Sequence, residues 1–210
     1  MRAKLTFTIL VCCAAPIAAQ APAIQTHTSE VGFSYSLPAD WEVVDTKPTL
    51  PQVQQEVAKT AKSEDEKKGI SCVQVALTAR HGDPASVVVV VALPYDCFGQ
   101  TMTEKDLPGF ASGAAEGIKN TFDISDPIHG SYALGTHSLW IERAKGVMKD
   151  HAQMKYTVET VCSVLKKGAV CWMAMAATDD GLHTFEQGAV ALDGEAPAAL
   201  VPANAFQKAP

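Results

Sequence analysis

The chain has 210 residues, of which 47% are hydrophobic and 19% are charged, with a formal net charge of −6. This composition is typical of a folded globule and excludes an intrinsically disordered chain. An acidic protein repels phosphate backbones, so we expect no nucleic-acid partner.

Residues 1–19 have the layout of a secretory signal peptide. Arg2 and Lys4 give a positive start, and an apolar run follows from Leu5 to Ala15. The run is about half of the roughly 20 residues that a membrane-spanning helix needs. We therefore expect export and cleavage rather than a membrane anchor.

Cleavage is expected after Ala19, which leaves one domain-sized chain. A cut after Ala21 would match the preferred small residues better, but Pro22 would follow it. Loss of two basic residues with the leader leaves 15 basic and 23 acidic residues, a net charge of −8. No second apolar stretch approaches membrane length, so the sequence predicts a secreted or periplasmic protein with no integral membrane segment after cleavage.

The mature chain is predicted to form a single domain over residues 31–195, preceded by a flexible lead over 20–30. An irregular tail rich in Ala and Pro is expected over 196–210. Apolar residues alternate with small ones from Val31 to Leu37, which predicts a half-buried strand. A turn at residues 38–40 and a short strand from Trp41 to Val44 follow.

A helix is predicted to begin near Thr49, because Gln52 completes a capping box. An apolar stripe at four-residue spacing follows: Val53, Val57 and Ala61. The charged stretch Ser63–Lys68 is expected to end this helix, with Gly69 as its stop.

Two strands, 70–79 and 86–94, are predicted on either side of a turn at Arg80–Pro84. The second strand contains five consecutive valines, Val87 to Val91. An unbroken β-branched run of this kind indicates a central strand covered on both faces.

A second helix is predicted over 103–120, regular from about Leu107 because Pro108 fits only the first turn. Glycines recur every fourth residue at Gly109, Gly113 and Gly117. We expect this glycine face to pack closely on a sheet. The remaining predicted strands are 132–134, 136–144, 154–165 and 169–177, with a hairpin turn at Lys166-Lys167-Gly168.

Four cysteines remain after cleavage and allow three pairings: Cys72, Cys97, Cys162 and Cys171. A hairpin centred between residues 84 and 85 places Cys72 opposite Cys97. A hairpin centred between residues 166 and 167 places Cys162 opposite Cys171. Cross-strand neighbours lie near disulfide distance, so these two pairs are predicted. The spacings match no zinc-ribbon pattern, although a zinc site is the alternative.

The sequence contains no recognised catalytic pattern and predicts no cofactor or metal site. His129 and His137 would share a metal only if one straight strand ran through two glycines. Asp179-Asp180-Gly181 is interpreted as a turn because the alternating ligands of a calcium loop are absent. Trp140 and Trp172 lie in strand patterns, and we expect both to be largely buried.

The segment Phe33-Ser-Tyr-Ser-Leu-Pro-Ala-Asp-Trp41 resembles the "F-x-Y-x-x-P-x-x-W" opening of the PsbP-like fold group, which includes small exported bacterial proteins. Gly135-Thr-His-Ser-Leu-Trp-Ile-Glu142 resembles the strand that follows the middle helix of that fold. The resemblance implies an α+β PsbP-like sandwich: a mostly antiparallel twisted sheet of about six to eight strands flanked by two or three helices. It also favours protein interaction over catalysis, and no binding residue is transferred from it.

The leading hypothesis is therefore an exported, non-enzymatic interaction or accessory module. Its expected partner is another protein or a component of the cell envelope. The alternatives are a small secreted hydrolase with a dispersed active site and a lipid or small-molecule carrier. The carrier would require an apolar cavity between the sheet and a helix.

Overall fold

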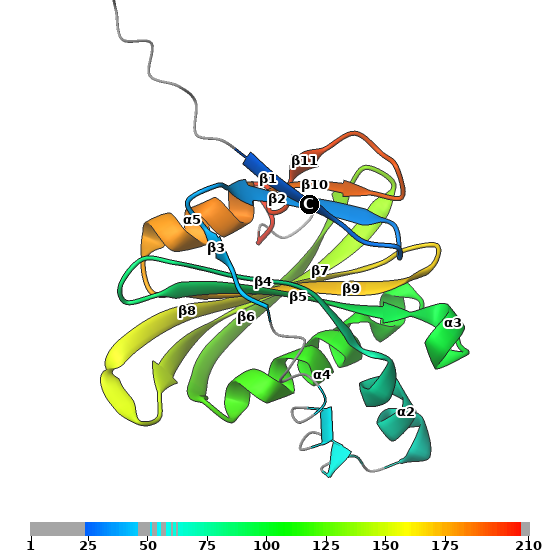
Figure 1. The fold of residues 1–210 in the computed structure, drawn as a ribbon, viewed down its shortest axis with the longest axis horizontal. Coiled ribbons are helices and arrows are strands. Elements are labelled where there is room, and N and C mark those ends of the chain that lie inside the picture. Colours follow the sequence, from blue (N-terminus) through cyan, green and yellow to red (C-terminus); the bar gives the residue numbers. More distant parts are fainter. Residues whose placement is uncertain are drawn as a thin grey trace, which may run out of the picture.

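The computed structural model describes residues 24–45 and 63–206, together with residues 51, 54, 55, 58, 59 and 61. The predicted leader, its cleavage point and most of the helix expected from Thr49 lie outside these residues. The described chain folds into three layers, with a large sheet between a smaller sheet and a helical layer (Figure 1).

The middle layer is a sheet of seven strands in which every neighbouring pair is antiparallel. Its order is β3 (Glu42–Val43), β4 (Gln74–His81), β5 (Ser86–Pro94), β9 (Gly168–Ala176), β8 (His151–Val164), β7 (His137–Met148) and β6 (Phe122–Leu134). The predicted α+β class with a mainly antiparallel sheet is confirmed.

A four-stranded sheet and a helix cover one face of the large sheet (Figure 1). The strands are β1 (Ile24–Thr28), β2 (Phe33–Pro38), β10 (Ala189–Leu192) and β11 (Ala198–Ala199), and the helix is α5 (Asp179–Gln187). The segment expected to be a flexible lead contains strand β1. This strand is ordered because it pairs with β2 along its whole length.

The interpretation of Asp179-Asp180-Gly181 as a simple turn is wrong, because these residues begin α5. Thr178 caps the helix: its Oγ1 accepts a hydrogen bond from the Gly181 backbone N–H at 3.1 Å. The two aspartates then lie in the first turn, where negative charge favours a helix.

The other face of the large sheet carries α4 (Leu107–Lys119), with α2 (Glu64–Cys72) and α3 (Tyr95–Phe98) beside it (Figure 1). The predicted start of α4 at Leu107 is confirmed. The expectation that its glycines pack on the sheet is wrong. Leu107 and Ala111 make the buried stripe, whereas Gly109, Gly113 and Gly117 have nothing within 4 Å of an added Cβ.

Helix α2 runs through Gly69 and continues to Cys72, so the predicted stop and the strand expected from residue 70 are both wrong. The backbone carbonyls at the C-terminal end of α2 accept hydrogen bonds from a residue elsewhere in the chain. The Gln54 side-chain amide donates to the backbone carbonyls of Ile70 and Val73 at 3.2 and 2.8 Å. These contacts supply partners for carbonyls that a helix end leaves free.

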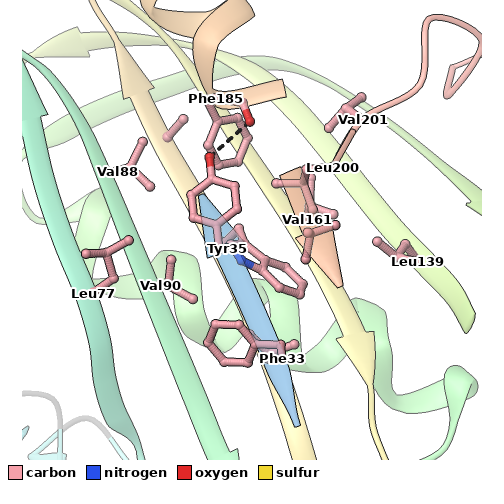
Figure 2. Close-up of a cluster of buried hydrophobic side chains, with 14 of the residues drawn as sticks. Phe33, Tyr35, Leu77, Val88, Val90, Leu139, Val161, Phe185, Leu200 and Val201 are labelled. Carbon is pink, nitrogen blue, oxygen red and sulfur yellow. Dashed lines mark hydrogen bonds between the residues drawn. The ribbon is translucent and has the colours of Figure 1, made fainter. Parts of the chain in front are cut away.

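The core between the two sheets is filled by large side chains (Figure 2). Phe33 meets Trp172 edge to face at 5.4 Å, and the Tyr35 hydroxyl donates to the Phe185 carbonyl at 3.0 Å. Strand β5 contributes valines to both layers: Val88 and Val90 to this core and Val91 to the α4 side. The predicted central valine strand is confirmed.

Of the three tryptophans, Trp172 is fully buried as predicted, and Trp41 is buried as well. Trp140 is partly buried, in agreement with the prediction that it is largely buried, and it keeps some exposed surface. Its ring lies near the outer strand β6, where His129 stacks on it at 5.2 Å.

Candidate functional site

Both disulfides are present in the structure, in the predicted pairing. Cys162 and Cys171 are directly opposed residues of β8 and β9, with Cα atoms 4.1 Å apart. This is the register expected from a hairpin centred on the two lysines. The bond lies in the layer between the large sheet and α4.

The Cys72–Cys97 bond forms for a different reason from the predicted one. Cys72 is the last residue of α2 and Cys97 lies in α3, so neither is in a strand. The β4–β5 hairpin pairs Gln74 with Ala92, three residues away from the partner expected from the predicted register. The bond therefore joins two short helices at the end of this hairpin.

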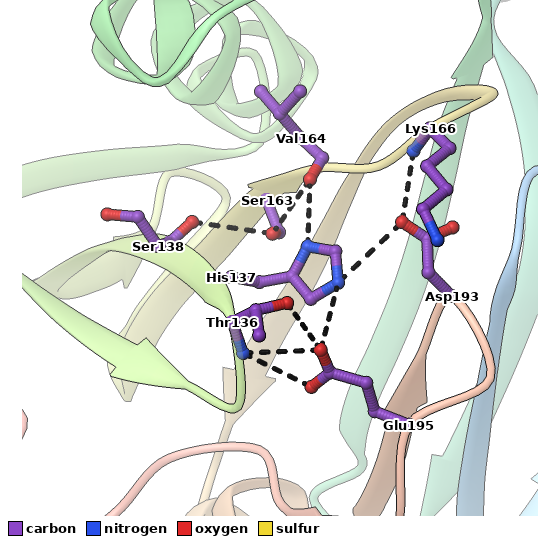
Figure 3. Close-up of polar contacts among 8 residues, drawn as sticks. All are labelled: Thr136, His137, Ser138, Ser163, Val164, Lys166, Asp193 and Glu195. Atoms are coloured by element: carbon purple, nitrogen blue, oxygen red, sulfur yellow. Dashed lines mark hydrogen bonds and ion pairs between the residues drawn. The ribbon is translucent and has the colours of Figure 1, made fainter.

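A polar cluster joins three turns at one end of the sheets (Figure 3). The β6–β7 turn supplies Thr136 and His137, and the β8–β9 turn supplies Lys166. The chain after β10 supplies Asp193 and Glu195. Segments about 30 residues apart in the sequence thus meet at one point.

The His137 ring has a partner on each nitrogen (Figure 3). Nδ1 lies 3.3 Å from the Val164 carbonyl, and because a carbonyl only accepts, Nδ1 carries the hydrogen. Nε2 faces two carboxylates, Asp193 Oδ2 at 3.6 Å and Glu195 Oε1 at 3.9 Å. The imidazole therefore bridges the β8–β9 turn and the β10–β11 connection.

Glu195 is held by the β6–β7 turn. The Thr136 backbone N–H donates to its two carboxylate oxygens at 3.2 and 3.3 Å, and the Thr136 hydroxyl donates to the same group. The hydroxyl contact is the main reason that the pKa of Glu195 is lowered from its usual value. Gly135 leaves the room for this contact, because an added Cβ would lie 1.6 Å from Glu195 Oε2.

Asp193 ties the third turn into the cluster. Its Oδ2 accepts the Lys166 backbone N–H at 3.1 Å, and its side chain is only 7% exposed. Asp193 itself adopts a left-handed φ of 47°, a conformation that Asp tolerates better than most residues. The carboxylate thus fixes the position of the β8–β9 turn against the small sheet.

An open hollow of about 430 Å³ lies beside this cluster. Its lining combines the start of β2, the β8–β9 turn and the end of β10: Gly32, Phe33, Ser34, Lys166, Lys167, Ala191, Asp193 and Gly194. We call it the Lys166 hollow. Phe33 and Ala191 make part of its wall apolar, whereas both lysines are exposed to solvent.

A second polar network is buried between the large sheet and α5. Arg143 contacts Glu159 and Glu186, and its guanidinium lies 4.6 Å from the centre of the Phe206 ring. Burial raises the pKa of Glu159 to about 7, and the charge of Glu186 adds to this, while Arg143 opposes it. Glu159 is fully buried, so this network is placed to hold the fold together rather than to meet a substrate.

A smaller hollow of about 280 Å³ lies at the β4–β5 turn. His81 Nε2 lies 3.2 Å from Asp40, and the His81 ring stacks on Trp41 at 5.6 Å. Arg80 pairs with Glu42 at 2.9 Å, which lowers the pKa of that carboxylate. These exposed pairs make a polar turn, as predicted for this segment.

The structure separates most of the residues weighed for chemistry in the sequence. His129 stacks on Trp140, whereas His137 lies at the β6–β7 turn, so the two histidines do not meet. Among the described residues, no group of three or more His, Cys, Asp or Glu side chains could hold a metal ion. None of the helices in the same residues is long and apolar enough to cross a bilayer.

Sequence reasoning missed both polar clusters, because their members come from separate turns and strands. The Asp193-Gly194 pair is a turn signal that could have marked one member. No local spacing connects it to His137. The Arg143–Glu159 contact follows only from the β7–β8 register, in which the two residues are opposed.

No family model matches the chain, and no curated protein matches it. Among solved structures, it is similar to the solution structure of cyanobacterial PsbP (CyanoP) from Synechocystis sp. PCC 6803, with 12% sequence identity and a TM-score of 0.40. The match covers 82% of this chain and 90% of that one. This similarity is one of fold alone. The sequence motifs described above resemble the same PsbP-like fold group.

Proposed function

We propose that the chain is an exported, non-enzymatic interaction module that binds another protein or a component of the cell envelope through the Lys166 hollow. The observation that carries this proposal is the locked rim of the hollow. His137, Asp193 and Glu195 join three turns, and Asp193 and Lys166 of this cluster line the hollow. A preformed rim loses little conformational freedom when a partner docks.

Two disulfides support an oxidising compartment outside the cytoplasm, because such bonds are rare in reducing compartments. Both lie on the face of the large sheet that carries α4, one at the β8–β9 hairpin and one between α2 and α3. This supports a small exported domain whose surface shape is held by covalent links.

The geometry around His137 favours binding over hydrolysis. A nucleophile must hydrogen-bond to the base that activates it. The Ser163 hydroxyl contacts the carbonyls of Ser138 and Val164 at 3.4 and 3.5 Å, and the Thr136 hydroxyl donates to Glu195. The Nε2 atom of His137 faces carboxylates instead.

The carrier alternative needs a cavity between the large sheet and α4. That layer is occupied by packed side chains, including Leu107, Ala111 and the Cys162–Cys171 bond. The core on the other face holds Trp172 with no exposed surface. The surface hollow is therefore the better candidate for a binding site.

The charge at the hollow indicates the chemistry of the partner. Lys166 and Lys167 form an exposed cationic pair on a chain that is acidic overall. Complementary charge speeds association and selects the partner. We infer that the partner places an acidic group against the lysines and a small apolar group beside Ala191.

Charge reversal at the hollow tests this function. The double variant Lys166→Glu/Lys167→Glu is compared with a matched control, Lys105→Glu/Lys155→Glu, at two exposed lysines elsewhere. Each protein is crosslinked in an extract of the native cell envelope, and the products are quantified by mass spectrometry. We expect the wild-type protein and the control to capture the same partner, and the hollow variant to capture at least about tenfold less.

Equal capture of the partner by both double variants would show that the Lys166 hollow does not bind it. Turnover by the wild-type protein on a panel of ester and peptide substrates, lost in His137→Ala, would instead favour the hydrolase.

A further inference from the structure

The outer edge of β6 ends the large sheet, and no strand of the described chain pairs with it. Such an edge presents unpaired backbone N–H and C=O groups that join another strand unless charges, proline or bulges block it. The first half of β6 is blocked in this way. It contains Asp123, Asp126 and Pro127, and the ladder shifts between Ser125 and Ile128.

The second half of β6, from Ile128 to Leu134, has none of these features. It contains no Asp, Glu, Lys, Arg or Pro. Its register with β7 is continuous over all seven residues. Ile128 is 52% exposed and is one of three large hydrophobic residues that the described chain leaves exposed. We call this segment the open edge.

The two faces of the open edge carry different side chains. Tyr132 and Leu134 pack against the core between the sheets, and Gly130 and Ile128 lie on the same face by strand alternation. His129 lies on the α4 face, where it stacks on Trp140. Ser131 and Ala133 share that face and are exposed.

We propose that a second copy of this chain pairs with the open edge, β6 to β6 and antiparallel, about a twofold axis at Ser131. The two large sheets then form one continuous sheet of fourteen strands, from two sheets of seven. A symmetric contact of this kind places the same surface on both sides. The proposal does not depend on the Lys166 hollow.

The sequence of the open edge is complementary to itself in this register. Ile128 lies opposite Leu134 of the other copy, and Gly130 lies opposite Tyr132. On the other face, His129 meets Ala133 and Ser131 meets Ser131, so no like charges are opposed. This pairing also covers the exposed Ile128 side chain.

The limits of the open edge select the register. Pro127 precedes it, and the β6–β7 turn with Gly135 at a φ of 60° follows it. Only a pairing centred on Ser131 aligns all seven residues with their symmetry mates. A shift of two residues in either direction leaves two residues of each strand unpaired, and a shift of one places core-facing side chains on the wrong face.

A pairing of seven residues makes a small interface, so the dimer is expected to be weak and dependent on concentration. Sedimentation velocity of the full mature protein is the first measurement, from about 1 to 200 µM, the range in which small interfaces dissociate. We expect the weight-average mass to rise from monomer toward dimer. Ser131→Lys, which brings two cations together at the axis, abolishes the rise, whereas the control Ser125→Lys on the same strand outside the open edge keeps it.

A crosslink checks the register itself. Ser131→Cys places two thiols opposite each other across the axis, and mild oxidation of the folded protein is expected to give a covalent dimer on a non-reducing gel. Ser125→Cys, at an equally exposed position of β6, is expected to stay monomeric. A monomer at every concentration, a dimer that survives Ser131→Lys, or equal crosslinking of both cysteine variants would each overturn the proposal.

Discussion

At the scale of single residues, the protein depends on carboxylates that are held by specific partners. Glu195 is stabilised in its charged form by Thr136, which lowers its pKa. Glu159 is in the opposite situation, because burial raises its pKa to about 7 although Arg143 lies against it. A carboxylate that the fold prefers to protonate costs stability when it ionises.

The pH dependence of stability tests this assignment. Because the folded-state pKa of Glu159 lies above its ordinary value of 4.5, its contribution is fully present below pH 4.5 and is lost as the pH rises through 7. We expect the free energy of unfolding of the wild-type protein to fall over this range, by at most about 1.4 kcal/mol per pH unit from this group. Glu159→Gln removes the titration and is expected to flatten the profile.

Glu142→Gln is the matched control, since Glu142 is next to Arg143 in β7 but points to the opposite face. Denaturant unfolding at pH 4.5, 5.5, 6.5 and 7.5 measures all three proteins. An unchanged slope in Glu159→Gln, or a flattened slope in Glu142→Gln, would show that another group titrates.

At the scale of elements, α4 carries a feature that packing does not explain. Gly109, Gly113 and Gly117 lie on its exposed side with open space over each. Glycine in a helix interior costs up to about 1 kcal/mol relative to alanine, because more backbone freedom is lost on folding. Helix α4 is therefore less stable than it would be with alanine at these three positions.

Replacing all three glycines by alanine is expected to raise the free energy of unfolding by about 1.5 to 3 kcal/mol. Gly135→Ala is the contrasting variant, because its added Cβ would collide with Glu195, and it is expected to destabilise the protein. Thermal unfolding monitored by circular dichroism compares both with the wild type. A triple variant less stable than the wild type would mean that the glycine face contacts something that the structure does not describe.

The success of sequence reasoning also differed from element to element. The β8–β9 hairpin was predictable because both strands are long, apolar and symmetric about Lys166-Lys167-Gly168. The predicted strand over 132–134 captured only the end of β6, which begins at Phe122, because Pro127 and Gly130 interrupt its pattern. Strand β1 was missed because it is polar and is ordered only by its pairing with β2.

The candidate site could be predicted less well than the fold. The cysteine pairs followed from hairpin geometry, correctly for Cys162–Cys171 and from a wrong register for Cys72–Cys97. The His137 cluster and the Lys166 hollow depend on how turns from both sheets meet. That arrangement depends on packing between the two sheets, such as the contact of Phe33 with Trp172, which no local pattern in the sequence encodes.

At the scale of the whole molecule, one scaffold carries the two surfaces proposed above. The two disulfides and the core between the sheets hold the scaffold. The Lys166 hollow is the proposed partner site, and the open edge of β6 is the proposed contact with a second copy. The two disulfides are consistent with an oxidising compartment outside the cytoplasm.

The most direct test of this central claim is the intact mass and non-reducing peptide map of the protein purified from its native source. The account predicts a chain that begins at Gln20, with Cys72 linked to Cys97 and Cys162 linked to Cys171. A chain that still begins at Met1 and carries four free thiols, or one that links Cys72 to Cys162 or Cys171, would contradict it.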